Sequence, residues 1–182
     1  YITSSTLDSR LEMTKFLVTG AAGLVGSQLV NDLVKKNIDV YSCYHLTKPE
    51  NGIFTQLDLT DKEQIVNTIQ TIKPDVVIHL AAITDVDICE TKQDLASKIN
   101  SKATEIIAKE CTKSNIFLVY VSTDYVFDGK SGMYKEEDET NPVGFYGKSK
   151  LDGEKAVQNF ATYWCIARTS TPFGLHPVKK NF

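Results

Sequence analysis

The sequence predicts an α/β fold built around a doubly wound parallel sheet. Short apolar runs alternate along the chain with segments whose apolar residues recur at helical spacing. One of these runs, at 76–80, is almost entirely apolar, which is typical of a strand covered by helices on both faces of the sheet. Strands that alternate with helices in this way form parallel sheets with right-handed crossover connections.

Length and composition indicate a single globular domain. The chain has 182 residues, a net charge of −3 and no cluster of basic residues, so a nucleic-acid-binding surface is not expected. No apolar run is long enough to span a membrane and no signal-peptide pattern is present, which favours a cytoplasmic protein without a membrane partner. The four cysteines are far apart and the three histidines lack metal-ligand spacing, so we expect reduced thiols and no metal site.

The N-terminal segment has no periodic pattern. Met13 has the character of a natural start, so we expect residues 1–12 to be an added leading segment outside the fold. The folded domain is then expected to cover residues 13–182.

The first predicted strand, at 16–19, ends in a glycine-rich turn. Gly20, Gly23 and Gly26 are spaced three apart, and the helical pattern that follows stops at Asn37. In a strand–turn–helix unit, the free N–H groups and the positive dipole end of the helix face the space over the turn, and glycine lets a phosphate approach the backbone. The turn therefore predicts nucleotide binding; the alternative is a tight turn without a ligand.

Two more strands and a helix precede the apolar run described above. The second strand is predicted at 38–43 and the third at 54–57. Thr60 and Glu63 have the spacing of a capping box for a helix that ends before Pro74.

The second half of the chain continues the alternation. The predicted elements are a loop at 81–91, a helix at 93–111, a strand at 117–121, a polar segment at 122–141, a helix at 144–160 and a sixth strand at 163–167. A structureless segment as long as 122–141 inside a compact domain is usually functional.

Two candidate catalytic side chains lie on the helix after the fifth strand, near the edge where ligands bind in such sheets. Tyr146 and Lys150 are four residues apart, so a helix places both on one face. We predict that the Lys150 ammonium lowers the pKa of the Tyr146 phenol, which can then exchange a proton with a carbonyl oxygen. The alternative is an ordinary solvated helix face.

Further polar residues lie near this pair in the predicted fold. A hydroxyl of Ser122 or Thr123, at the end of the fifth strand, can orient the same carbonyl oxygen; the alternative is a polar strand end that closes a turn. Asn100 lies in mid-helix, where Asn is a poor helix former. It is expected either to hold a water or backbone near the site or to be a surface side chain.

Cofactor contacts are predicted at the ends of the second and third strands. Asp58 follows the third strand, where a carboxylate can accept from an adenine amino group; the alternative is a helix-flanking acid. Asp39 has the spacing of the acid that holds a ribose 2′-hydroxyl, but it begins the second strand instead of ending it. Because the end of that strand, Cys43-Tyr44-His45, has no carboxylate, the sequence favours NADP(H) over NAD(H).

The motifs GAAGLVG, HLAA and YGKSK, together with the Ser/Thr after the fifth strand, resemble the extended short-chain dehydrogenase/reductase superfamily. The segments HLAAITDVDICE (79–90) and STDYVFDGKSGMYKEEDETNP (122–142) are similar to the dTDP-4-dehydrorhamnose reductase family. The resemblance covers the chain from Met13 onward. It implies a Rossmann-type domain, truncated before a C-terminal substrate lobe, and reduction of the 4-keto group of a nucleotide-linked deoxysugar by NADPH or NADH.

The resemblance also implies roles for individual residues. The catalytic residues would be Thr123, Tyr146 and Lys150, and the substrate-binding residues Thr84, Asp124, Tyr125 and Arg168. The implied cofactor contacts are Gly20, Gly23, Leu24, Val25, Gly26, Tyr44, His45, Asp58, Leu59, Ala81 and Ala82, together with Tyr146 and Lys150.

Two departures from the family leave the exact substrate open. The family usually carries Trp directly after Arg-Thr-Ser, where this chain has Thr171, and members continue into a substrate lobe beyond the position of Phe182. One alternative is a sugar-nucleotide epimerase or dehydratase. Dehydratases of this type carry Thr-Asp-Glu after the fifth strand, whereas this chain has Tyr125 in place of the Glu. The other is a non-catalytic regulatory subunit that binds nucleotide. A homodimer is expected at the family level.

Overall fold

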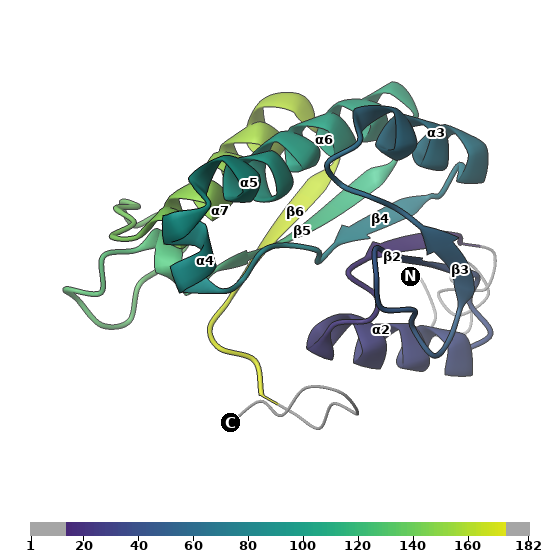
Figure 1. Ribbon diagram of the computed structural model, residues 1–182, viewed down its shortest axis with the longest axis horizontal. Coiled ribbons are helices and arrows are strands. Elements are labelled where there is room, and N and C mark those ends of the chain that lie inside the picture. Colours follow the sequence, from purple (N-terminus) through teal and green to yellow (C-terminus); the bar gives the residue numbers. More distant parts are fainter. Residues whose placement is uncertain (1–13, 174–182) are drawn as a thin grey trace, which may run out of the picture.

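The predicted doubly wound parallel sheet is confirmed by the computed structural model, which describes residues 14–173 (Figure 1). Six parallel strands lie in the order β3-β2-β1-β4-β5-β6, the Rossmann-type arrangement. The strands are β1 (Phe16–Thr19), β2 (Val40–Tyr44), β3 (Ile53–Gln56), β4 (Val76–His79), β5 (Phe117–Thr123) and β6 (Trp164–Thr169). The predicted leading segment and the start at Met13 lie outside the described residues.

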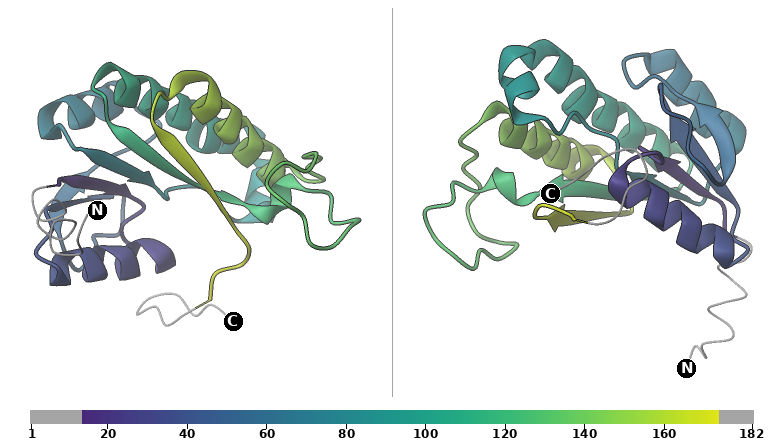
Figure 2. Two further views of the ribbon diagram at one scale, coloured as in Figure 1. Left: turned by 180° about the vertical axis from the view of Figure 1, so that it is seen from behind. Right: turned by 60° about the horizontal axis from the view of Figure 1, so that its bottom comes forward.

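The helices are divided unequally between the two faces of the sheet. Helix α2 lies against one face, and the remaining helices cover the other (Figures 1 and 2). The α-helices are α2 (Leu24–Lys35), α3 (Lys62–Ile72), α4 (Val86–Thr91), α5 (Gln93–Ser97), α6 (Ala103–Lys113) and α7 (Phe145–Phe160). Within residues 14–173, none of the helices is both long and apolar enough to cross a membrane.

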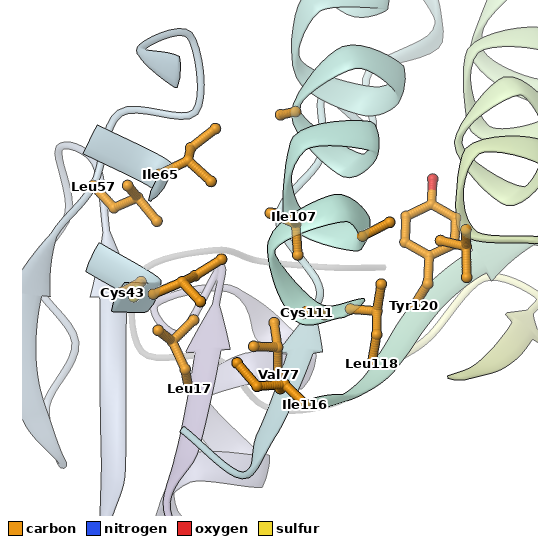
Figure 3. Close-up of a cluster of buried hydrophobic side chains, with 14 residues drawn as sticks. Leu17, Cys43, Leu57, Ile65, Val77, Ile107, Cys111, Ile116, Leu118 and Tyr120 are labelled. Atoms are coloured by element: carbon orange, nitrogen blue, oxygen red, sulfur yellow. The ribbon is translucent and has the colours of Figure 1, made fainter. Parts of the chain in front are cut away.

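Each face of the sheet has its own apolar core. On the face covered by α3 to α7, strand residues Leu17, Val77 and Leu118 pack against α3 and α6 (Figure 3). Other members shown there are Cys43, Leu57, Ile65, Ile107, Cys111, Ile116 and Tyr120. On the opposite face, Val18 and Val40 pack against Val30 of α2. Alternate strand residues therefore enter opposite cores, as expected for a sheet that is covered on both faces.

Helix ends follow the sequence signals only in part. Asn37 has a φ of 58°, and its N–H donates to Val34 O, so it stops α2 as predicted. The predicted capping box is wrong, because Asp61 caps α3 through hydrogen bonds from the amides of Glu63 and Gln64. The carboxylate of Asp61 satisfies two helix amides by itself, which leaves no capping role for a hydroxyl one residue earlier.

The helix predicted at 93–111 is present, as a continuous helical segment from Gln93 to Lys113, whereas the loop predicted at 81–91 is wrong from Val86 onward. The loop contains α4, which is capped by the Asp85 side chain through the Ile88 amide at 2.9 Å. The long helix contains one turn of π-helix, Lys98–Lys102, between α5 and α6. This turn lies at Asn100, whose side chain binds backbone outside the helix.

Strand β5 extends beyond its predicted end. Ser122 and Thr123 belong to the strand and pair with Arg168 and Thr169 of β6. A 3₁₀ turn, Asp124–Val126, follows at once, so the segment 122–141 is not structureless throughout. The strand therefore fixes the backbone of Ser122 and Thr123, the two residues whose hydroxyl groups were predicted to orient a carbonyl oxygen.

A chain of buried polar groups connects β1, β4 and α6. The His79 ring lies 2.7 Å (Nδ1) from Thr19 Oγ1 and 3.1 Å (Nε2) from Thr104 Oγ1, and its side chain is fully buried. Burial, reinforced by the Lys150 charge, lowers the pKa of His79 to about 3. The imidazole is therefore neutral in the folded protein at neutral pH.

This buried histidine makes stability depend on pH. Since the unfolded chain takes up the proton near pH 6.5 and the folded chain only near 3, its contribution is complete above pH 6.5 and is lost as the pH falls. We expect a slope of up to about 1.4 kcal/mol per pH unit from this one group. Urea unfolding at several pH values gives the free energy of unfolding as a function of pH. This free energy should change less steeply with pH in His79→Gln than in wild type. If the exposed control His45→Gln reduced the pH dependence of the free energy of unfolding equally, His79 would not be its source.

Candidate active site

The glycine turn has the geometry predicted for a phosphate cradle. Gly20 has a φ of 70°, and the Gly23 amide donates to Gly20 O at 2.9 Å. Gly23 is the N-cap of α2 and has no side chain that could cap the helix amides. The start of the helix is therefore open to an anion over the turn.

Gly26 allows the close packing of this turn. A Cβ at this position would lie 2.2 Å from Gly20 O, which is backbone and cannot move aside alone. We expect Gly26→Ala to lower the free energy of unfolding by about 1–3 kcal/mol and to weaken nucleotide binding. Urea unfolding and nucleotide titration measure the two effects. In the control Gly132→Ala, a Cβ would meet no atom within 4 Å, so equal losses in both variants would contradict the prediction.

The predicted adenine-side residues lie together at the carboxyl ends of β2 and β3. Tyr44 ends β2, and His45 Nε2 lies 3.8 Å from Asp58 Oδ2 just beyond β3. Asp58 Oδ1 accepts from the Thr60 amide at 2.8 Å, and mainly this bond lowers the pKa of Asp58. Leu59 packs partly on the apolar core. As predicted, Asp39 precedes β2, so it lies at the amino ends of the strands and not at the carboxyl ends where ligands bind.

The segment after β4 lies directly against the glycine turn. A Cβ on Gly20 would come within 2.9 Å of the Ala81 amide nitrogen. Thr19 Oγ1 accepts from the amides of Leu80 and Ala81, both at 3.2 Å. The structure thus brings together the ends of β1 and β4 as two sides of one surface.

Tyr146 lies in the first turn of α7 and is half-buried. Its ring meets the edge of the Tyr125 ring, with centroids 5.6 Å apart. The predicted direction of its pKa is wrong. Burial raises the pKa of the Tyr146 phenol, and a hydrogen bond with the Thr123 side chain only partly offsets this increase.

Lys150 does not lower the pKa of Tyr146 because its ammonium is held elsewhere. Its Nζ donates to Val121 O at 2.8 Å and lies 4.1 Å from the centroid of the Tyr120 ring. The side chain is 2% exposed, and burial lowers the pKa of Lys150 to about 7, against the opposing effect of the Glu154 carboxylate. Lys150 is therefore a buried group that titrates near neutral pH.

Asn100 holds backbone near the site, which was one of its two predicted roles. It is fully buried; its Oδ1 accepts from the Ile83 amide at 2.8 Å, and its Nδ2 donates to Ile83 O at 3.0 Å. Nδ2 also donates to Ser149 Oγ at 3.0 Å, and that hydroxyl donates to Tyr146 O at 2.8 Å. The π-turn thus connects the segment after β4 to the helix that carries Tyr146 and Lys150.

A pocket of about 600 Å³ opens beside Tyr125. Three of the four predicted substrate residues line it, Asp124, Tyr125 and Arg168, whereas Thr84 is exposed outside it. The segment between β5 and α7 forms much of the wall and projects beyond the sheet (Figure 2). Neither Tyr146 nor Lys150 lines the pocket, but the Tyr125 ring connects it to Tyr146.

These features match a known family over nearly the whole chain. The family model described as the RmlD substrate binding domain covers residues 14–182. The chain belongs to the RmlD substrate binding domain family.

RmlD-type relatives include both a reductase and a subunit of another enzyme. The chain is 38% identical to dTDP-4-dehydrorhamnose reductase of Aggregatibacter actinomycetemcomitans, over 89% of this chain and 53% of that protein. It is 40% identical to methionine adenosyltransferase 2 subunit beta of Rattus norvegicus, over 79% of this chain and 42% of that protein. The chain thus spans about half the length of these curated relatives.

A solved RmlD-type structure has the same fold. It is the dTDP-4-dehydrorhamnose reductase of Bacillus anthracis str. Ames in complex with NADP, with a TM-score of 0.77 and 35% identity. The match covers 86% of this chain and 53% of that one. The similarity therefore includes most of the residues that the structure describes.

Arg168, predicted to bind substrate, is already engaged in this RmlD-type site. Its Nε and Nη2 donate to the two carboxylate oxygens of Glu154 at 3.0 and 2.8 Å, and its Nη1 donates to Glu136 O at 3.2 Å. The guanidinium also lies 5.1 Å from the centroid of the Phe127 ring. Substrate binding by Arg168 stays a prediction, while its contacts clearly support one wall of the pocket.

Sequence reasoning missed Glu90. Its Oε1 accepts from the Phe145 amide at the start of α7, at 2.5 Å. The signal was indirect: Gly144 precedes the helix without a capping side chain, and the first turn of the helix has no acidic residue. Such a helix start needs a partner from another part of the chain.

Proposed function

We propose that this chain is the cofactor-binding and catalytic part of an NAD(P)H-dependent sugar-nucleotide reductase, acting on a 4-keto group as dTDP-4-dehydrorhamnose reductases do. The observation that carries the proposal is the half-buried Tyr146 phenol, whose pKa is influenced by the Thr123 side chain and whose ring contacts Tyr125 at the wall of a pocket. The open glycine turn supports nicotinamide dinucleotide binding at the same edge of the sheet. The similarity to a reductase solved with NADP points the same way.

The side chains present suit the proton transfer of a ketone reduction. A bound reduced nicotinamide would supply hydride to the carbonyl carbon. Because burial raises the pKa of Tyr146, the phenol keeps its proton at neutral pH and can donate it to the carbonyl oxygen. Thr123 would orient that oxygen. Lys150, whose ammonium donates to Val121 O, would hold the nicotinamide ribose, as the family resemblance implies.

NADP(H) is the proposed cofactor in preference to NAD(H). The end of β2, Tyr44 and His45, has no carboxylate to hold a ribose 2′-hydroxyl. Lys48, in the segment that follows β2, lies over the Phe54 ring of β3 at 4.2 Å.

The test combines cofactor titration with turnover by the full-length protein. Calorimetry should give tighter binding of NADPH than of NADH, and a panel of nucleotide 4-keto-sugars should include one that oxidises the bound cofactor. An absence of oxidation with every sugar, together with intact NADPH binding, would overturn the proposed reduction.

A non-catalytic regulatory subunit is the second candidate. The 40% identity to methionine adenosyltransferase 2 subunit beta favours it, since that protein is named as a subunit of another enzyme. Co-purification of a partner enzyme whose activity depends on this protein, without turnover of any sugar, would establish it. An epimerase or dehydratase is less well supported, since this chain has Tyr125 at the position where dehydratases of this type carry Glu. A cytoplasmic location and a homodimer stay predictions.

A further inference from the structure

We infer that Glu90 is a positioning residue for Tyr146, acting as an external cap that fixes the first turn of α7. The inference rests on the proposed function insofar as Tyr146 is the proton donor. The structural part, that Glu90 sets the placement of Tyr146, stands on contacts between α4 and α7 alone.

The cap connects two segments that are far apart in the sequence. Glu90 lies in α4, and its Oε1 accepts from the Phe145 amide at 2.5 Å, across 55 positions of sequence. A Cβ on Gly144 would come within 3.0 Å of the same oxygen. The carboxylate is therefore seated on the end of α7, where the N-cap glycine leaves room for it.

Helix α7 has no internal means of satisfying this end. Its N-cap, Gly144, makes no side-chain hydrogen bond, and its first turn has no acidic residue. A carboxylate at this position accepts from an otherwise unpaired amide and lies at the positive end of the helix dipole. Since Tyr146 directly follows Phe145, fixing that amide fixes the backbone from which the phenol extends.

The origin of the cap explains why it bears on catalysis. Helix α4 begins three residues after Ile83, whose backbone is held by Asn100 and which follows the surface formed by Ala81 against Gly20. Glu90 thus couples the cofactor side of the site to the start of α7. The second contact on α7, from Asn100 to Ser149, holds the helix one turn further along.

The test compares four variants of the full-length protein. Glu90→Ala removes the cap, Glu90→Asp keeps the charge but is one methylene too short, and Glu90→Gln keeps an acceptor oxygen of the same reach. Asp32→Ala, which removes an exposed carboxylate of α2 on the opposite face of the sheet, is the matched control. Each variant is measured for kcat, for the KM of the cofactor and for the ring-carbon signal of ¹³Cζ-labelled Tyr146.

Positioning predicts a specific pattern. Glu90→Ala and Glu90→Asp should lower kcat about tenfold or more with the cofactor KM little changed, because small displacements of a catalytic group are costly. Both should shift the Tyr146 signal and its titration, whereas Glu90→Gln and Asp32→Ala should resemble wild type. If Glu90→Ala does not fold, Glu90→Asp decides on the same readouts.

The two hypotheses fail in different ways. An unshifted Tyr146 signal in folded Glu90→Ala or Glu90→Asp would overturn the inference, whether or not the protein turns over a sugar. A wild-type protein that turns over no sugar, with the Tyr146 signal still shifted by loss of the cap, would overturn the proposed function and leave Glu90 as the positioning residue. A loss of stability alone, with unchanged kcat and signal, would reduce Glu90 to a structural cap.

Discussion

Replacing Tyr146 by phenylalanine in the full-length protein is expected to lower kcat by about 10²–10⁴-fold, the range for loss of a general acid. The half-buried phenol is influenced by the Thr123 side chain and is the proposed proton donor, and the phenylalanine ring would fill the same space without a proton to give. Cofactor affinity should fall much less than kcat, because the glycine turn is untouched. Turnover is measured by cofactor oxidation, and affinity by calorimetry.

An exposed tyrosine provides the matched control for this substitution. Tyr163 lies just before β6 and is 53% exposed, so Tyr163→Phe should leave kcat at the wild-type value. If Tyr146→Phe were as active as Tyr163→Phe, the proposed proton transfer would be wrong.

Replacing Glu154 by alanine is expected to destabilise the chain by about 3–5 kcal/mol, the usual cost of removing one partner of a buried ion pair. The Glu154 side chain is 1% exposed and binds Arg168 through both carboxylate oxygens. Its loss leaves a largely buried guanidinium without its main partner. Urea unfolding, monitored by circular dichroism, measures the change.

The same helix offers an exposed ion pair for comparison. Asp152 Oδ1 lies 3.6 Å from Lys155 Nζ, and both side chains are exposed to solvent. Asp152→Ala should cost less than about 1 kcal/mol, because exposed pairs are screened by water. Equal losses for Glu154→Ala and Asp152→Ala would mean that burial does not determine the strength of the Arg168 pair.

The strands and the glycine turn were predictable because their signals are local. An apolar run such as 76–80 and the spacing of Gly20, Gly23 and Gly26 depend on neighbouring residues, and the structure has the corresponding strand and turn where expected. Helix α4 was missed because six residues are too few to show a helical period. Its one local signal was Asp85, a suitable N-cap ahead of Ile88.

The chemistry of the site was harder to predict because it depends on long-range contacts. The direction of the Tyr146 pKa is set by burial, which no spacing reveals, and Lys150 is drawn to Val121 O on a strand instead of to the phenol. The π-turn at Asn100 follows from bonds to Ile83, 17 positions earlier. Residue type and spacing identified the candidates, whereas their electrostatics required the fold.

The packing of Gly20 against Ala81 has a consequence for the order of folding. The two residues meet only when β4 pairs with β1, where Thr19 lies opposite His79, and this pairing closes a long loop. Non-local closures of this kind are slow steps in folding. The proposed nucleotide surface, formed by Gly20 and Ala81, therefore does not exist in a chain that has formed only β1, α2 and β2. Added cofactor should slow the unfolding of the complete sheet but should not speed the first steps of folding.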